Sequence, residues 1–165
     1  MKTKILPFLL FIFFLSETTS GQEKVDTINS TKYEHALGAG VGGTIGYGLA
    51  YRFMPNDFGL LTTFAPFNDE YETIISFGVT FLYQLIETDN TNFFIYQGNQ
   101  YLYKEYKNRY YTYEKVNNIF NHGLGFGVEI VILKRISFNI MGGYSSYDNF
   151  ERIGFTGETG LFYRF

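Results

Sequence analysis

The chain has 165 residues, enough for one domain, and carries 13 Lys plus Arg against 16 Asp plus Glu. This mildly acidic balance lacks the excess positive charge that nucleic-acid binding requires, so we expect no nucleic-acid partner. The absence of Cys excludes disulfides and thiolate zinc sites. Aromatic residues make up 21% of the chain, and 18 glycines stand against 3 prolines, which favours closely packed β-strands.

The N-terminus has the features of a secretory signal peptide. Lys2 and Lys4 precede an apolar segment, residues 5–15, and small and polar residues follow it. The apolar segment is shorter than the roughly 20 residues of a membrane-spanning helix and contains Pro7, which disfavours the alternative of an anchor helix. We therefore expect a cleaved leader over 1–20, a polar periplasmic lead-in over 21–34, and one folded domain over 35–165.

The remaining chain follows a two-residue period of apolar and polar side chains, and turn residues punctuate it. No apolar stripe with the helical period of 3.6 residues is long enough to predict a helix. The pattern predicts eight strands: 35–43, 46–54, 58–66, 72–87, 91–103, 122–133, 135–147 and 152–165. The first of these is dense in glycine and offers few side chains for packing.

The connections between the predicted strands alternate in length. Those near residues 55–57, 87–90 and 133–135 are short, whereas the other set contains the one long connection, about 104–121. Transmembrane barrels have short periplasmic turns and longer external loops, so this alternation predicts which end faces outward. Around the long connection, the segments 97–106 and 109–116 flank Lys107 and Asn108, which suggests a hairpin that rises above the membrane.

One face of the predicted strands carries no charge. In the last three strands it bears Leu124, Phe126, Val128, Ile130, Ile132, Ile136, Phe138, Ile140, Tyr144, Ile153, Phe155, Leu161, Tyr163 and Phe165. A Lys or Arg on a lipid-facing wall costs about 2–4 kcal/mol at mid-membrane, which explains such segregation. We therefore predict an all-β, eight-stranded, antiparallel, up-and-down transmembrane β-barrel. The alternative is a soluble secreted lipid-binding barrel, which would turn the same apolar face inward.

The chain ends in an aromatic-rich stretch, residues 158–165. It resembles the C-terminal signal that the barrel-assembly machinery recognises in outer-membrane β-barrel proteins of Gram-negative bacteria. Glu158, Gly160, Tyr163 and Phe165 occupy the polar, glycine, third-last and last positions of that signal. The resemblance, to small barrels of the OmpA/OmpX type, implies a monomer in the cell outer membrane, in contact with outer-membrane lipid and lipopolysaccharide.

Several charged and polar side chains are expected inside the barrel. Glu129 and Asn139 lie five positions on either side of residue 134, and a turn near 148–149 brings Asn139 to Glu158. Arg52, Arg152 and Arg164 are candidate counter-charges. We interpret this set as a structural polar network. The alternative is a narrow pore or proton path, which the small interior of an eight-stranded barrel disfavours.

His122 and Ser146 lie twelve positions on either side of residue 134, so we expect them on the outer wall near the outer interface. Outer-membrane lipid A deacylases carry a catalytic His and Ser at a similar place, which makes this pair a weak candidate for acyl transfer. The other interpretation is an interfacial His beside a loop Ser, because no acid completes the set convincingly. We expect no cofactor and no metal site, since His35 has no second ligand in view.

Residues 97–118, around the long connection, supply the candidate contact surface. Tyrosines alternate with charged residues along them: Tyr101, Tyr103, Tyr106, Tyr110, Tyr111 and Tyr113. Tyr is enriched at binding sites, although a belt of Tyr at the lipid headgroups is an equal reading. The sequence thus favours a non-enzymatic role in surface interaction, adhesion or envelope integrity, through a partner protein or glycan. The enzyme alternative is a lipid A-modifying acyl hydrolase.

Overall fold

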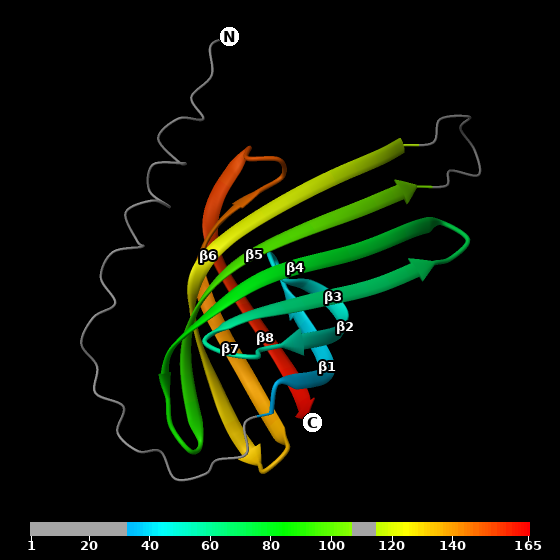
Figure 1. The fold of residues 1–165 in the computed structure, drawn as a ribbon. Helices are drawn as coiled ribbons and strands as arrows, with labels where there is room; N and C mark the ends of the chain where they lie inside the picture. Colours follow the sequence, from blue (N-terminus) through cyan, green and yellow to red (C-terminus); the bar gives the residue numbers. More distant parts are fainter. Residues whose placement is uncertain (1–32, 107–114) are drawn as a thin grey trace. The chain divides into compact units, whose positions relative to one another are not determined.

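The computed structural model describes residues 33–106 and 115–165, so the predicted leader and most of the lead-in lie outside the described residues. Each strand pairs antiparallel with the next and β1 closes on β8, which confirms the predicted eight-stranded barrel (Figure 1). The strands are β1 His35–Gly42, β2 Gly46–Phe53, β3 Phe58–Asn68, β4 Glu72–Glu87, β5 Thr91–Tyr106, β6 Lys115–Leu133, β7 Ile136–Tyr147 and β8 Arg152–Arg164. No helix in these ranges could span a membrane.

Most strands match their predicted bounds closely, but β5 and β6 continue further outward than predicted. Tyr106 pairs with Lys115, and the turn predicted around Lys107 and Asn108 lies outside the described residues. The register of this hairpin is set lower down, where Gln97 pairs with Leu124 within the barrel wall. Because the buried faces fix which residues pair within the barrel wall, they also fix the pairing further along both strands, even where the sequence favours a turn elsewhere.

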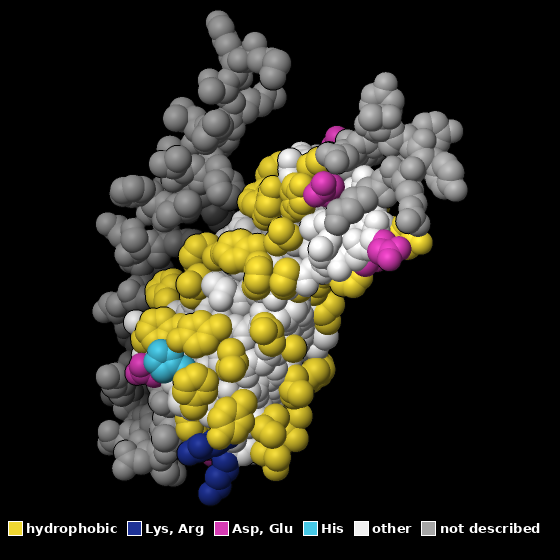
Figure 2. Space-filling view, turned by 90° about the vertical axis from the view of Figure 1, so that its right-hand side faces the viewer, with side chains coloured by type: hydrophobic (Ala, Val, Ile, Leu, Met, Phe, Trp, Pro, Cys, Tyr) yellow, Lys and Arg dark blue, Asp and Glu magenta, His cyan; other side chains and the backbone are white. Residues whose placement is uncertain are grey.

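The outer wall is apolar, as the face assignment predicted. Phe126, Phe155 and Leu161 are 66%, 77% and 52% exposed, whereas the alternate positions on the same strands are buried. Figure 2 shows hydrophobic side chains covering much of one side of the barrel. A continuous apolar surface of this kind is unfavourable in water and is what a lipid environment requires. The alternative of a soluble barrel with a polar exterior is therefore wrong.

The interior is more apolar than the sequence analysis anticipated. Large side chains fill it beside the polar ones: Leu61, Leu82, Phe94, Tyr96, Met141 and Phe162. Glycines on neighbouring strands make room for the rings, since a Cβ at Gly127 would meet the Phe94 ring at 2.4 Å. The interior of a barrel this small is thus a packed core, as strand number and barrel width dictate.

The strands differ greatly in length, and this sets the shape of the outer end. β1 and β2 have 8 residues each, whereas β4 and β5 have 16 and β6 has 19. The ladder between β1 and β8 stops at Gly42 and Glu158, and that between β2 and β3 stops at Leu49 and Phe64. Beyond those points β3–β6 continue as a sheet that extends past the short β1–β2 hairpin (Figure 1).

Candidate functional site

The turn between β1 and β2 folds into the barrel and is buried there. Thr44 and Ile45 are both fully buried. The Thr44 hydroxyl donates a hydrogen bond to Glu158 Oε1, and the Ile45 amide donates to Glu158 Oε2 at 3.1 Å. Thr63 donates to the Ile45 carbonyl oxygen, and the Asn121 amide donates to the carbonyl oxygen at the start of the turn at 3.1 Å. We call residues 43–45 the plug turn.

Glycines on the facing wall create the space that the plug turn occupies. A Cβ at Gly78 would lie 1.8 Å from the Ile45 carbonyl oxygen, and one at Gly123 would lie 2.6 Å from Thr44 Oγ1. With any larger residue at position 78, either the backbone of the plug turn or strand β4 would have to move. The plug turn also needs Gly46, whose φ of 81° is in the region that favours glycine.

Glu158 is the anchor of the plug turn and is held only by neutral donors. Besides the plug turn, the hydroxyls of Thr156 and Tyr96 donate to its Oε1 at 3.0 and 3.4 Å. Within the described ranges no Arg, Lys or His forms an ion pair with it. A buried carboxylate that accepts several hydrogen bonds can persist without a counter-charge because those donors replace its hydration.

The counter-charges expected beside Glu158 lie elsewhere, which corrects the sequence interpretation. Arg152 is exposed and pairs with Asp148 at 2.7 Å in the β7–β8 turn. Arg164 donates to the carbonyl oxygen of Lys134 at 3.0 Å, at the opposite end of the barrel. Both residues occupy inward positions of β8, but each stands at an end of the strand, where a long side chain reaches water.

A second contact crosses the lumen from β2 to β6. Arg52 Nη2 lies 2.7 Å from Glu129 Oε1, and both side chains are almost fully buried. Asn92 donates to the other carboxylate oxygen at 3.0 Å, and the guanidinium lies 5.3 Å from the centre of the Phe162 ring. The pair is thus satisfied on both sides, which a buried ion pair needs in order to be stable.

Asn139 has one of its two predicted neighbours. It lies opposite Glu129, but its partner on β8 is Gly160, and Glu158 lies opposite Met141 instead. The predicted Asn139–Glu158 pairing is therefore wrong. The side-chain amide of Asn139 is fully buried and has no hydrogen-bond partner among the described residues.

On the outer wall, His122 and Ser146 lie directly opposite one another, on β6 and β7. No hydrogen bond joins these two described residues, and Ser146 Oγ is shielded from solvent without a partner. His122 instead bonds Asn99 Oδ1 through Nδ1 at 2.8 Å, between the rings of Phe120 and Phe150. The geometry does not supply the accessible nucleophile that acyl transfer requires. The sequence analysis did not identify Asn99 as the partner of His122. The feature that could have indicated it is a polar residue at a position of β5 that faces outward.

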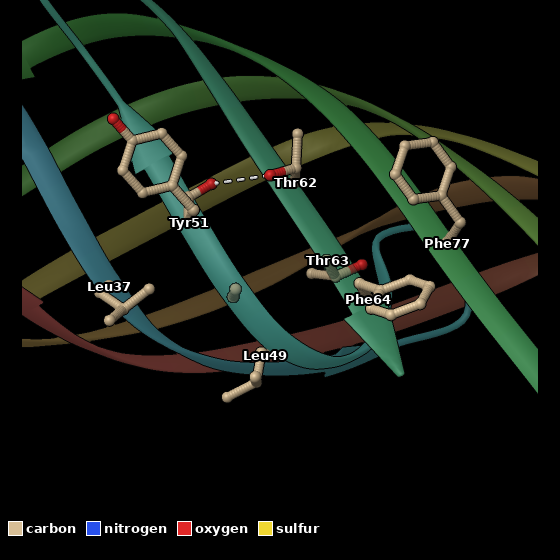
Figure 3. Close-up of a pocket in the computed structure, with 8 residues that line it drawn as sticks. Leu37, Leu49, Tyr51, Thr62, Thr63, Phe64 and Phe77 are labelled. Carbon is tan, nitrogen blue, oxygen red and sulfur yellow. Dashed lines mark hydrogen bonds between the residues drawn. The ribbon is translucent and has the colours of Figure 1, made fainter. Parts of the chain in front are cut away.

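A shallow hollow of about 210 Å³ lies elsewhere on the outer wall, over β1–β4. Figure 3 shows the apolar side chains around it and the hydrogen bond from Thr62 to the Tyr51 carbonyl oxygen, 3.4 Å long. Its lining is Leu37, Leu49, Ala50, Tyr51, Thr62, Thr63, Phe64 and Phe77. Such a lining suits the acyl chain of a surrounding lipid and offers no reactive group.

Three of the predicted contact tyrosines lie at the outer end of β5. Tyr101 donates to Asn118 Oδ1 at 2.8 Å and Tyr103 to Glu105 Oε2 at 3.0 Å, while Tyr106 is exposed at the end of the strand. The other three tyrosines, Tyr110, Tyr111 and Tyr113, lie outside the described residues. Within the described ranges no group of three potential metal ligands occurs.

The C-terminal residues close the barrel. The Phe165 amide donates to the His35 carbonyl oxygen at 2.9 Å, and His35 returns a bond at 3.3 Å. Arg135, in the turn before β7, donates to the Tyr163 hydroxyl at 2.9 Å, and this hydrogen bond raises the pKa of the guanidinium further above its usual range. Glu158 faces the lumen, so it also has a structural role in the fold. Recognition of Glu158, Gly160, Tyr163 and Phe165 by an assembly machinery stays a prediction.

No protein-family model and no curated protein sequence matches the chain. The fold is similar to solved structures. The N-terminal β-barrel domain of Pseudomonas aeruginosa OprF aligns with a TM-score of 0.59 at 10% identity, over 79% of this chain and 96% of that one. Ail, the attachment invasion locus protein of Yersinia pestis, aligns with a TM-score of 0.50 at 16% identity, over 79% and 96%.

The closed eight-stranded barrel and its apolar outer wall define the class of this protein. It is an eight-stranded transmembrane β-barrel with the fold of the small barrels to which its structure is similar. Its membrane lipid is therefore part of its surroundings on every side of the barrel wall.

Proposed function

We propose that this protein is a non-enzymatic surface-binding protein of the outer membrane, and that the outward sheet of β3–β6 is its contact surface. The observation that carries the proposal is the length of β4, β5 and β6. A tilted strand of roughly 9–11 residues crosses a membrane, whereas these strands have 16, 16 and 19 residues. The excess is a paired sheet that rises above the lipid.

The side chains of this sheet suit recognition. Tyr101 and Tyr103, the eleventh and thirteenth residues of β5, lie where this sheet leaves the lipid. Asn118 and Glu105 hold their hydroxyls, so their rings are already positioned before a partner arrives. Positioned aromatic side chains lose little conformational entropy on binding, which favours affinity. Ail, which has been crystallised with the heparin analogue sucrose octasulfate, shows that a barrel of this fold can bind a sulfated saccharide. A partner protein or a glycan fits the same surface here.

The interior supports a surface role over transport. The plug turn with Glu158 and the Arg52–Glu129 pair cross the lumen at two places. Among the described residues, buried side chains such as Leu61, Tyr96 and Phe162 fill the space between them, which disfavours a path for an ion or solute. The narrow-pore alternative has no observation in its favour.

The test is binding of bacteria that display the protein to host cells and to immobilised glycans. A triple variant, Tyr101→Ala with Tyr103→Ala and Tyr106→Ala, is compared with Tyr51→Ala plus Tyr83→Ala, which removes outward tyrosines near the other end of the barrel. We expect binding to fall with the triple variant alone, while both variants show the faster-migrating folded band on unboiled gels. Equal binding by all three proteins would contradict the proposal and favour an envelope-integrity role, which detergent sensitivity of a deletion strain measures.

A further inference from the structure

A hydrogen-bonded polar cluster lies on the outer wall of the barrel, on the face that otherwise contacts lipid. It consists of Gln97, Asn99 and His122, all half-buried at outward positions of β5 and β6. Asn99 lies directly opposite His122, and Gln97 is its neighbour on the same face of β5. Polar side chains on such a face require a reason, because each carries hydrogen-bonding atoms that acyl chains cannot satisfy.

The position of the cluster in the membrane follows from strand geometry. Asn99 lies eight residues beyond Thr91, where β5 begins at the periplasmic turn. At about 2.5 Å of height per residue in a tilted strand, this places it roughly 20 Å up an apolar band about 25 Å tall. The cluster therefore faces the region where the headgroups of outer-leaflet lipids meet their acyl chains.

The hydrogen bonds determine which atoms of the cluster are occupied. Asn99 Nδ2 donates to the Val79 carbonyl oxygen at 3.2 Å, and a carbonyl can only accept, so Asn99 Oδ1 must face His122. Gln97 Nε2 and His122 Nδ1 both donate to that oxygen at 2.8 Å, while Gln97 Oε1 accepts from Asn99 Nδ2 at 3.1 Å. Both Nδ2 hydrogens and both lone pairs of Asn99 are thus used.

What remains open faces the lipid. His122 carries its proton on Nδ1, so the neutral ring presents Nε2 as an unoccupied acceptor. Gln97 keeps one amide hydrogen and one oxygen lone pair. His122 Nε2 can accept a hydrogen bond, and the Gln97 amide can both donate and accept one. Together they match hydroxyl groups, each of which can donate and accept.

The ring of His122 is held firmly in place. Phe120 meets it edge-on with centroids 4.2 Å apart, and Phe150 stacks on it at 4.7 Å. Phe150 reaches this position from a turn in which it has a φ of 74°, a conformation that costs a residue with a large side chain about 1 kcal/mol or more. Phe150 as a residue is also 68% exposed, so it offers an apolar surface against which the non-polar face of a sugar can pack.

We infer that Gln97, Asn99 and His122 form a binding site for the hydroxyl-bearing sugar headgroup of an outer-leaflet glycolipid. His122 Nε2 accepts a hydrogen bond from one sugar hydroxyl, and the Gln97 amide bonds its neighbour. Phe150 packs against the sugar ring. The acyl chains of the same lipid then lie along the apolar wall below, over Leu124 and Phe126.

The test exploits the two histidines of the chain. His35 is also stacked among aromatic rings and bonded through Nδ1, to Tyr51 at 2.7 Å, but it lies at the other end of the barrel. Protein with ¹⁵N-labelled histidine is placed in nanodiscs of phosphatidylcholine, of phosphatidylcholine with phosphatidylglycerol, or of phosphatidylcholine with digalactosyl diacylglycerol. We expect the galactolipid to move the Nε2 resonance of His122 while that of His35 stays in place.

Lipid retained through purification from mixed bilayers gives the second readout. We expect His122→Phe and Gln97→Leu each to lower galactolipid enrichment about three- to tenfold, as the loss of one or two hydrogen bonds would. Thr62→Val removes an outward polar group on β3 and serves as the matched control, with no change expected. All variants are checked for the folded band on unboiled gels.

Three results would overturn the inference. The first is an equal response of both histidines, and the second is enrichment unaffected by Gln97→Leu in a folded protein. The third is an equal response to phosphatidylglycerol, which would show that the site binds any hydroxylated headgroup rather than a sugar.

Discussion

Arg52 and Glu129 form an ion pair of 2.7 Å across the barrel, between β2 and β6, with almost no exposure of either side chain. Both strands must close into the same barrel before these residues can meet, so the pair reports on the completed fold. Together with the plug turn it makes the interior a continuous packed structure.

The first prediction concerns this pair. Glu129→Ala leaves the Arg52 guanidinium buried without a partner, so we expect the free energy of unfolding in lipid vesicles to fall by about 3–5 kcal/mol. The double replacement Arg52→Met with Glu129→Leu removes both charges, and we expect it to recover most of that loss. Urea titration of both variants measures the difference, and a double variant no more stable than Glu129→Ala would contradict the account.

The second prediction concerns the space for the plug turn. In Gly78→Val, the added side chain meets the Ile45 carbonyl oxygen, so the plug turn must leave its position. We expect conductance in planar bilayers from this variant and none from the natural protein. Gly157→Ala is the control, because a Cβ there would meet no atom within 4 Å. A folded Gly78→Val protein that remains closed would mean that the plug turn does not seal the lumen.

The third prediction concerns the anchor of the plug turn. Glu158→Gln leaves a single oxygen to accept from the Ile45 amide, which now donates at 3.1 Å, and from the hydroxyls of Thr44, Thr156 and Tyr96, which the two carboxylate oxygens now share. We expect the plug turn to be less stable by about 1–3 kcal/mol, as for other unsatisfied buried groups. Hydrogen exchange at the Ile45 amide measures this, with Glu87→Gln at an exposed position as the control. Unchanged exchange would show that the other contacts of the turn suffice.

The fourth prediction compares two neighbours in β8. Phe162 is 1% exposed inside the barrel, and Leu161 is 52% exposed on the outer wall. Phe162→Ala opens a cavity beneath Arg52, so we expect a loss of about 3–5 kcal/mol. Leu161→Ala loses only contact with lipid, and we expect a clearly smaller effect in the same urea titration. Equal losses would mean that the interior is not a packed core.

The amino-acid sequence by itself determined the strands, their faces and the membrane class of the fold. These follow from a period of two, which is a local property: each outward apolar residue along β6–β8 can be recognised from its immediate neighbours. The positions of the interior charged residues along the barrel axis were harder to derive, because the turns set which residues pair across neighbouring strands. In the β7–β8 turn Asp148, Asn149 and Phe150 all have positive φ, and the centre of pairing shifts by one residue, which separates Asn139 from Glu158.

Only the tertiary structure decided what closes the barrel and what the outer wall presents. Thr44 and Ile45 looked like an ordinary turn, and nothing local shows that they fold inward to Glu158, 114 and 113 residues away. Asn99 and His122 meet because β5 and β6 pair, and Phe150 reaches them from a third connection. Contacts between residues far apart in the chain depend on register and barrel closure, which emerge only when all eight strands are in place.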